Sequence, residues 1–158
     1  MWSNDGKQLL LTMQVPWAEH DVDDMDADSR RPRAANFLPY RRDGSGPLLG
    51  HRIQLVQVDA DSGEQRTLVE GDFNVSSAQW SPDGRQLAFV RNRLGKQRHR
   101  TDLWHADFDG SNARQATHEQ ASVSGPRWSP DGKHIAFGGS CIEGNSLTNL
   151  WLLEVGSG

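Results

Sequence analysis

The chain has 158 residues, with 17 Lys or Arg against 21 Asp or Glu and a net charge of −4. This balance argues against a general nucleic-acid binder, whose domain usually carries a basic excess, and the single cysteine, Cys141, excludes an intrachain disulfide and a Cys-rich zinc site. No apolar run approaches the ~18 residues of a membrane span, and the first residues lack the basic and apolar regions of a signal peptide, so we expect no membrane segment and no leader.

One pattern recurs three times along the chain: a tryptophan, a turn that ends in Asp-Gly, and an apolar run. Proline at the first inner position of a turn fixes φ, and Asp-Gly supplies the left-handed geometry that closes a tight hairpin. The tryptophan therefore ends one strand and the apolar run begins the next. The repeated positions are Trp2, Asp5 and Gly6, then Trp80, Pro82, Asp83 and Gly84, and finally Trp128, Pro130, Asp131 and Gly132.

Each turn unit is followed by a second strand pair. Further apolar strands are expected at 53–59, 102–107 and 149–155, and hairpin turns at 61–63 and 109–112. One repeat is therefore four short antiparallel strands, which we name A to D. In the second repeat they are expected at 75–80, 86–91, 102–107 and 113–117.

The repeat predicts an all-β fold of about three β-propeller blades, each of four antiparallel strands. Trp80 and Trp128 lie 48 residues apart, within the ~40–50 of a propeller blade, and the recurring tryptophans indicate packing between adjacent blades. We expect blade 1 at about 1–70 with a B–C loop insertion at 14–50, blade 2 at about 71–118, and blade 3 at about 119–158 without its last strand. A closed ring needs roughly four to eight blades, so the ring is incomplete, and two copies of three blades would form a six-bladed ring.

The Trp-Ser-Pro-Asp-Gly repeat resembles TolB-like propeller repeats. Residues 36–44 (Asn-Phe-Leu-Pro-Tyr-Arg-Arg-Asp-Gly), 50–55 and 71–80 resemble acylaminoacyl-peptidase-like members of the prolyl oligopeptidase family. That resemblance implies a separate α/β-hydrolase domain, which carries the catalytic Ser, Asp and His, with the Ser in a Gly-x-Ser-x-Gly elbow. The segment 138–142 fails this pattern at its last position, so we expect no peptidase activity from this chain itself.

The resemblance implies an auxiliary function. The propeller would admit short or unfolded peptides, exclude folded proteins and orient substrates for the hydrolase domain of a serine peptidase. Its partners would be the remainder of the propeller, that domain and peptide substrates. The alternative is a TolB-like protein-interaction scaffold. We expect a cytoplasmic protein, or a periplasmic one if a leader lies upstream.

The long, dissimilar B–C loops, at about 14–50, 92–101 and 139–148, are the expected functional face, because loops on a rigid scaffold carry function. Arg41 and Arg42 follow Tyr40 in the longest loop. A guanidinium can hold a carboxylate with two parallel hydrogen bonds. These three residues are candidates for contact with a peptide end or with the hydrolase domain, and the alternative is a solvated loop or a local pair with Asp43.

Three other groups are interpreted as structural. The acidic run lacks the Gly and Glu of a calcium-binding EF-hand loop, which favours a solvated loop. The basic run lacks stacking aromatics, which favours a solvated hairpin loop, with docking onto an acidic domain as the alternative. The histidines lack metal-ligand spacing, so we expect neither a metal nor a cofactor. These groups are Glu19, Asp21, Asp23, Asp24, Asp26 and Asp28; Arg91, Arg93, Lys96, Arg98, His99 and Arg100; and His20, His51, His99, His105, His118 and His134.

Overall fold

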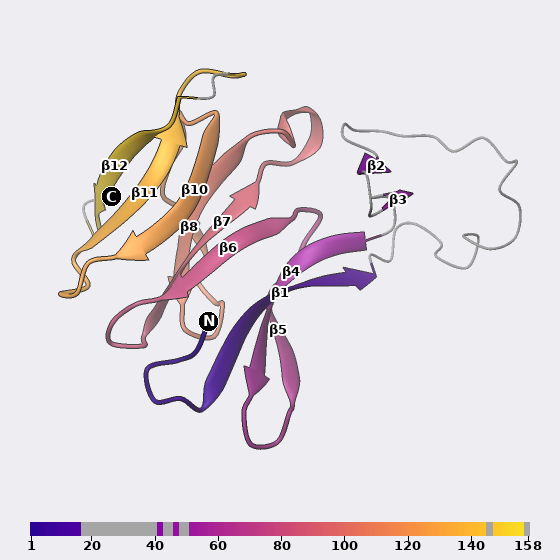
Figure 1. Cartoon of the computed structure of the whole chain (residues 1–158), viewed down its shortest axis with the longest axis vertical. Coiled ribbons are helices and arrows are strands. Elements are labelled where there is room, and N and C mark those ends of the chain that lie inside the picture. Colours follow the sequence, from indigo (N-terminus) through magenta and orange to yellow (C-terminus); the bar gives the residue numbers. More distant parts are fainter. Residues whose placement is uncertain (17–40, 43–45, 48–50, 145–146, 157–158) are drawn as a thin grey trace, which may run out of the picture.

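The computed structural model describes residues 1–16, 41–42, 46–47, 51–144 and 147–156, with the backbone alone at 41–42 and 46–47. Within these ranges the chain forms three antiparallel sheets of three, four and three strands, plus one separate short strand pair. The helical part of these ranges is a single 3₁₀ turn at Gly95–Gln97. The sheets stand side by side and do not close into a barrel (Figure 1). The predicted all-β class and partial propeller are confirmed.

The three sheets follow one another along the chain. Sheet 1 has the order β1 (Gln8–Pro16), β4 (His51–Asp59), β5 (Gln65–Val69), and a bridge from Trp2 to Leu9 adds a first contact beside β1. Sheet 2 has the order β6 (Val75–Trp80), β7 (Gln86–Asn92), β8 (Thr101–Asp107), β9 (Arg114–Gln115). Sheet 3 has the order β10 (Ser122–Trp128), β11 (His134–Ser140), β12 (Asn149–Glu154). The short pair is β2 (Arg41–Arg42) with β3 (Gly46–Pro47).

The turn before β7 shows why the repeated residues form a tight hairpin. The Ser81 hydroxyl donates to Asp83 Oδ1 (2.6 Å) and accepts the backbone N–H of Gln86 (2.9 Å). The hydrogen bond from Ser81, followed by one from the backbone of Arg85, lowers the pKa of Asp83. Gly84 has φ 72°, a left-handed conformation that glycine adopts without strain. The turns at Ser3–Asp5 and Ser129–Asp131 repeat these contacts.

Neighbouring sheets pack against each other through two hydrophobic cores, and β7 contributes side chains to both. Since successive side chains of a strand point to opposite faces, Leu87 and Phe89 face sheet 1 while Ala88 and Val90 face sheet 3. Core 1 contains Leu10, Leu55, Leu68, Val69, Phe73, Val75, Trp80, Leu87, Phe89 and Ala106. Core 2 contains Ala88, Val90, Leu103, Val123, Trp128, Ile135 and Phe137.

Hydrogen bonds between sheets reinforce this stacking. The backbone N–H of Trp128 donates to Gln79 Oε1 (2.9 Å), and its indole N–H donates to the Gln79 carbonyl (3.4 Å). The Asn4 side-chain amide donates to the Pro82 carbonyl one junction earlier. Each sheet is thus held against the next at the end that carries the tight turns.

Candidate functional site on the loop face

We call the loop face the end of the sheets formed by residues 70–74, 92–101, 116–121, 140–144 and 147–148. Two backbone hydrogen bonds bring these segments together: Asn92 N–H donates to the Asn74 carbonyl (3.1 Å), and Thr101 N–H donates to the Ala121 carbonyl (3.4 Å). The pairing of Pro16 with His51 places the long insertion of sheet 1 at the ends of β1 and β4. The loop face therefore gathers the long connections, while tight turns occupy the opposite end.

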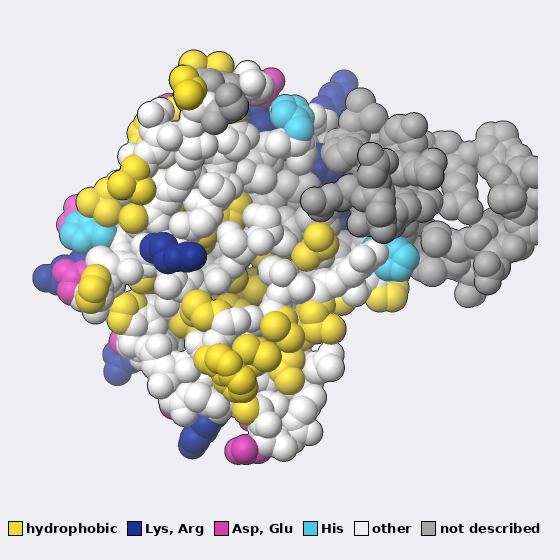
Figure 2. Space-filling view, in the orientation of Figure 1, with side chains coloured by type: hydrophobic (Ala, Val, Ile, Leu, Met, Phe, Trp, Pro, Cys, Tyr) yellow, Lys and Arg dark blue, Asp and Glu magenta, His cyan; other side chains and the backbone are white. Residues whose placement is uncertain are grey.

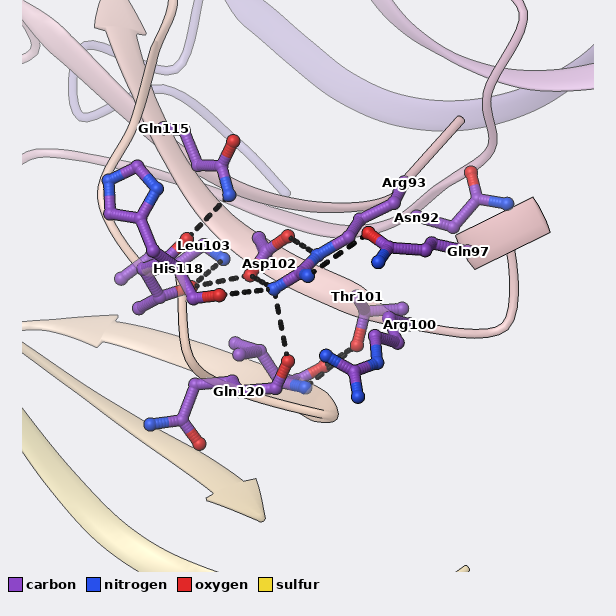
Figure 3. Close-up of polar contacts among 12 residues, drawn as sticks. Asn92, Arg93, Gln97, Arg100, Thr101, Asp102, Leu103, Gln115, His118 and Gln120 are labelled. Atoms are coloured by element: carbon purple, nitrogen blue, oxygen red, sulfur yellow. Dashed lines mark hydrogen bonds and ion pairs between the residues drawn. The ribbon is translucent and has the colours of Figure 1, made fainter. Parts of the chain in front are cut away.

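Arg93 forms the most heavily bonded group on the loop face (Figure 3). Its Nε donates to Asp102 Oδ2 (2.6 Å) and its Nη2 donates to Asp102 Oδ1 (3.0 Å). Nη2 also donates to the carbonyls of His118 (2.6 Å) and Gln120 (3.2 Å), and Nη1 donates to Gln97 Oε1 (3.3 Å). The hydrogen bond to Asp102 raises the pKa of Arg93. One guanidinium thus fastens the β7–β8 loop to the connection that leads into sheet 3.

Asp102 is the buried half of this ion pair, with a side chain only 1% exposed against 17% for Arg93. Its Oδ1 also accepts from the hydroxyl of Thr117 (3.2 Å), which in turn accepts the backbone N–H of Leu103 (3.0 Å). Both carboxylate oxygens are therefore occupied within the chain. A buried charge needs such pairing. The Arg93–Asp102 pair therefore has a structural role.

A second cluster joins sheets 1 and 2 through Asp72. Arg52 donates from Nε to Asp72 Oδ1 (2.7 Å), and Arg98 donates from Nη2 to Oδ2 (2.6 Å). Burial acts to raise the pKa of Asp72, but the hydrogen bonds from Arg98 and Arg52 outweigh it, and the pKa lies below its ordinary value. The carboxylate is 40% exposed while both arginines are buried. The cluster therefore pairs two buried arginines with one carboxylate that reaches the surface.

Arg91 lies beside this cluster and is held by aromatic rings. Its Cζ lies 3.6 Å from the ring centroid of Trp104 and 4.1 Å from that of Phe73. Burial lowers the pKa of Arg91, and the Asp102 carboxylate acts in the opposite direction. A guanidinium packed on aromatic rings gains roughly 0.5–2 kcal/mol per contact. Arg91 therefore stabilises the end of core 1.

Glu143 ties the loop of sheet 3 to the loop of sheet 2. Its Oε1 accepts from Arg100 Nε (2.5 Å) and lies 3.2 Å from His99 Nε2. The hydrogen bonds from His99 and then Arg100 lower the pKa of Glu143. Because Glu143 and His99 are half exposed, this contact contributes little to stability. It can still set the spacing between the two loops.

The residues predicted from the sequence as a substrate or domain contact are described only in part. The backbone of Arg41 and Arg42 forms β2, which pairs with β3 within the insertion. Their side chains, Tyr40 and the acidic run at 19–28 lie outside the described residues. Cys141 is exposed on the loop face, where its thiol donates to Gln120 Oε1 (3.6 Å). In the described ranges, no three His, Cys, Asp or Glu side chains are arranged to hold a metal ion.

The interpretation of 91–100 as a solvated hairpin loop was wrong for several of its arginines. Arg98 is buried, and Arg91 and Arg93 are partly buried in the contacts described above. Arg98 binds Asp72, which lies 26 residues away, and Arg93 reaches the carbonyls of His118 and Gln120 in the connection to sheet 3, so the loop sequence alone did not indicate these partners. The available signal was Asp72, an acidic residue in a connection between predicted strands.

Comparisons with known proteins agree with this architecture. No family model matches the chain. The uncharacterized peptidase YuxL of Bacillus subtilis (strain 168) is 35% identical over 94 residues, which are 58% of this chain. The chain is a partial propeller whose sequence is similar to that of a peptidase. This agrees with the predicted resemblance and is consistent with a propeller fragment of a prolyl oligopeptidase-family peptidase.

Solved structures extend the likeness in fold. TolB from Agrobacterium tumefaciens has a TM-score of 0.61 and 19% identity over 98% of this chain and 44% of that one. Puromycin hydrolase has a TM-score of 0.53 and 21% identity over 74% of this chain and 21% of its own. The chain spans 14% of the length of YuxL. Among the described residues, no helix has the length and apolar character needed to cross a bilayer.

Proposed function

We propose that this chain is a non-catalytic propeller segment of a serine peptidase of the acylaminoacyl, dipeptidyl or oligopeptidase type. In this proposal it gates and orients peptide substrates for an α/β-hydrolase domain outside the chain. The observation that carries the proposal is the 35% identity with a peptidase, on a fold that places its long connections on one face. The partners are the hydrolase domain, further propeller blades and peptides, and the compartment is the cytoplasm.

The loop face suits such a role because ion pairs hold its loops in place. The Arg93–Asp102 pair, the Asp72 cluster and the Glu143 contact each join a loop or connection to a neighbouring sheet or loop. A gate must exclude large substrates by keeping its opening fixed, and charge-assisted hydrogen bonds add geometric specificity. The chain contains no Gly-x-Ser-x-Gly segment, so we assign the chemistry to the other domain.

The proposal predicts that the insertion contributes to substrate recognition. In the full-length parent enzyme, Arg41→Ala and Arg42→Ala should each lower kcat/KM for a short peptide by more than about twofold, or roughly 0.4 kcal/mol. Arg85→Ala is the matched control, because Arg85 is an exposed arginine in the tight turn before β7, at the end opposite the loop face, and it should leave kcat/KM unchanged. If neither arginine variant differs from this control, the insertion does not recognise substrate.

A protein-interaction scaffold is the second candidate, favoured by the TM-score of 0.61 with a TolB structure over 98% of the chain. The reading frame of the parent gene separates the two. The peptidase proposal requires a Gly-x-Ser-x-Gly segment within an α/β-hydrolase domain of the same polypeptide. A reading frame that encodes propeller blades alone would favour the scaffold.

A further inference from the structure

The repeated tight turns contain an Asp-Gly pair, which is chemically labile in a flexible chain. The glycine amide nitrogen can attack Cγ of the aspartate side chain, and glycine has no side chain to hinder the attack. The N–Cγ bond forms, the Cγ–OH bond breaks, and the hydroxyl leaves as water with the amide proton, which gives a cyclic succinimide. Water then opens this ring to aspartate or to isoaspartate. Isoaspartate lengthens the backbone by one carbon and would distort a tight hairpin.

The turn before β7 holds both reacting groups in other contacts. Asp83 Oδ1 accepts the Ser81 hydroxyl (2.6 Å) and the backbone N–H of Arg85 (3.0 Å). The Gly84 N–H, whose nitrogen would attack, donates to the Ser81 carbonyl (2.9 Å). Ser81 is buried, at 3% exposure, so it is a fixed partner for both groups. Ring closure therefore requires the hydrogen bond of Gly84 to break and the carboxylate to leave its donors.

The ionisation of Asp83 opposes the reaction as well. The hydrogen bond from Ser81 is the largest cause that lowers the pKa of Asp83. Ring closure uses the protonated carboxyl group, because a hydroxyl can leave from it as water and an oxide cannot. A lowered pKa keeps the carboxylate ionised to lower pH, so the reactive acid is scarcer at neutral pH. Ser81 thus acts on the position and on the charge of the same carboxylate.

The same arrangement recurs at the three other Asp-Gly pairs within the described residues. In each, a serine two positions from the aspartate donates its hydroxyl to Oδ1, and the glycine N–H donates to the carbonyl three residues back. The serine, aspartate and glycine are Ser3, Asp5 and Gly6; Ser129, Asp131 and Gly132; and Ser111, Asp109 and Gly110. The serine hydrogen bond is the first cause of a lowered pKa at each of these aspartates.

Burial does not provide this protection. Asp83 and Asp131 are exposed, and charged side chains reach the surface along the left edge of the molecule, where Figure 1 shows the β6–β7 and β10–β11 turns (Figure 2). Water therefore has access to both turns. A bulkier residue in place of glycine would slow the attack, but Gly84 has φ 72°, where side chains are strained. Hydrogen bonds remain as the means of protection.

We propose that the serine beside each Asp-Gly pair protects the pair from succinimide formation, as Ser81 does for Asp83 and Ser129 does for Asp131. Each turn thereby keeps the left-handed glycine that its hairpin requires, without the chemical instability that Asp-Gly brings. This inference goes beyond the proposed function and does not depend on peptidase activity.

The test is prolonged incubation of the 158-residue chain at neutral pH, below its unfolding temperature. Electron-transfer mass spectrometry of proteolytic peptides measures isoaspartate at each site. Asp83 should isomerise more slowly in the chain than in a synthetic peptide of residues 78–88, a comparison that needs no variant. Ser81→Ala should raise the rate at Asp83 by at least about threefold, because the carboxylate loses one hydrogen bond. Asp131 in the same molecule is the internal control, and its rate should stay unchanged.

The reciprocal variant separates local protection from overall stability. Ser129→Ala should raise the rate at Asp131 and leave that at Asp83 unchanged. The proposal is overturned if Asp83 isomerises as fast in the intact chain as in the peptide, or if Ser81→Ala leaves its rate unaltered. An equal rise at both aspartates in either variant would also overturn it, because the cause would then be loss of the whole fold.

Discussion

Arg93→Met should destabilise the chain by about 3–5 kcal/mol, since it leaves a buried carboxylate without its charged partner. Asp102 is 1% exposed, and its two oxygens accept two hydrogen bonds from Arg93. The carbonyls of His118 and Gln120 lose a donor as well. Typical domains are stable by only ~5–15 kcal/mol, so this variant should lose much of its stability. Urea unfolding followed by tryptophan fluorescence measures the change.

Two further variants separate the buried pair from charge in general. Arg100→Met removes a cation whose partner Glu143 is 53% exposed, and the median contribution of such surface pairs is about 0–1 kcal/mol. The double variant Arg93→Met, Asp102→Leu removes both charges and should be more stable than Arg93→Met alone. The buried Arg93–Asp102 pair does not stabilise the chain as argued if Arg93→Met lowers the free energy of unfolding no more than Arg100→Met does.

Leu103→Ala should lower the free energy of unfolding by about 2–5 kcal/mol, whereas Leu150→Ala should change it by less than about 0.5 kcal/mol. Leu103 and Leu150 occupy the same place in the repeat, since each pairs with the residue ten positions after the repeat's tryptophan. Among the described residues of these 158, only Leu103 is covered by a following sheet: it is 0% exposed and packs in core 2, whereas Leu150 is 84% exposed. The cost of a core truncation combines lost burial with the cavity left behind. Urea unfolding followed by tryptophan fluorescence, at a protein concentration low enough to prevent self-association, measures both changes.

The comparison between these leucines is internally controlled, because the residue type, the position within the repeat and the substitution are the same, in β8 and β12. Equal losses of unfolding free energy for both variants would mean that Leu150 is buried as Leu103 is, contrary to its 84% exposure. Equal small effects would mean that sheets 2 and 3 are not packed through Leu103, contrary to the described core.

The regular part of the fold could be predicted because its causes are local. The second repeat was expected to have strands at 75–80, 86–91, 102–107 and 113–117, and the structure has Val75–Trp80, Gln86–Asn92, Thr101–Asp107 and Arg114–Gln115. Turn chemistry and two-residue alternation act within a few residues of each strand, so the sequence displays them directly. The last strand is shorter than expected: Ala116 N–H still donates to the Leu103 carbonyl, whereas Thr117 presents its hydroxyl to the Leu103 N–H.

The contacts of the loop face could not be predicted in the same way. Arg98 meets Asp72 from 26 residues away, and Arg100 meets Glu143 from 43 residues away. These pairs form only after three sheets have been placed side by side, and neither loop has a local pattern that names its partner. The tryptophans illustrate the same limit: Trp80 is 5% exposed and Trp2, at the same place in the repeat, is 56% exposed.

Radial stacking of the repeated sheets is the central claim, and inter-sheet nuclear Overhauser effects in the isotope-labelled chain test it most directly. The account predicts a cross-peak between the Trp128 indole N–H and Gln79, residues that lie 49 positions apart but on neighbouring sheets. It also predicts cross-strand peaks within sheet 2 between Ala88 and His105. Cross-strand peaks without any contact between Trp128 and Gln79 would contradict it, because the hairpins would then form without stacking into a propeller.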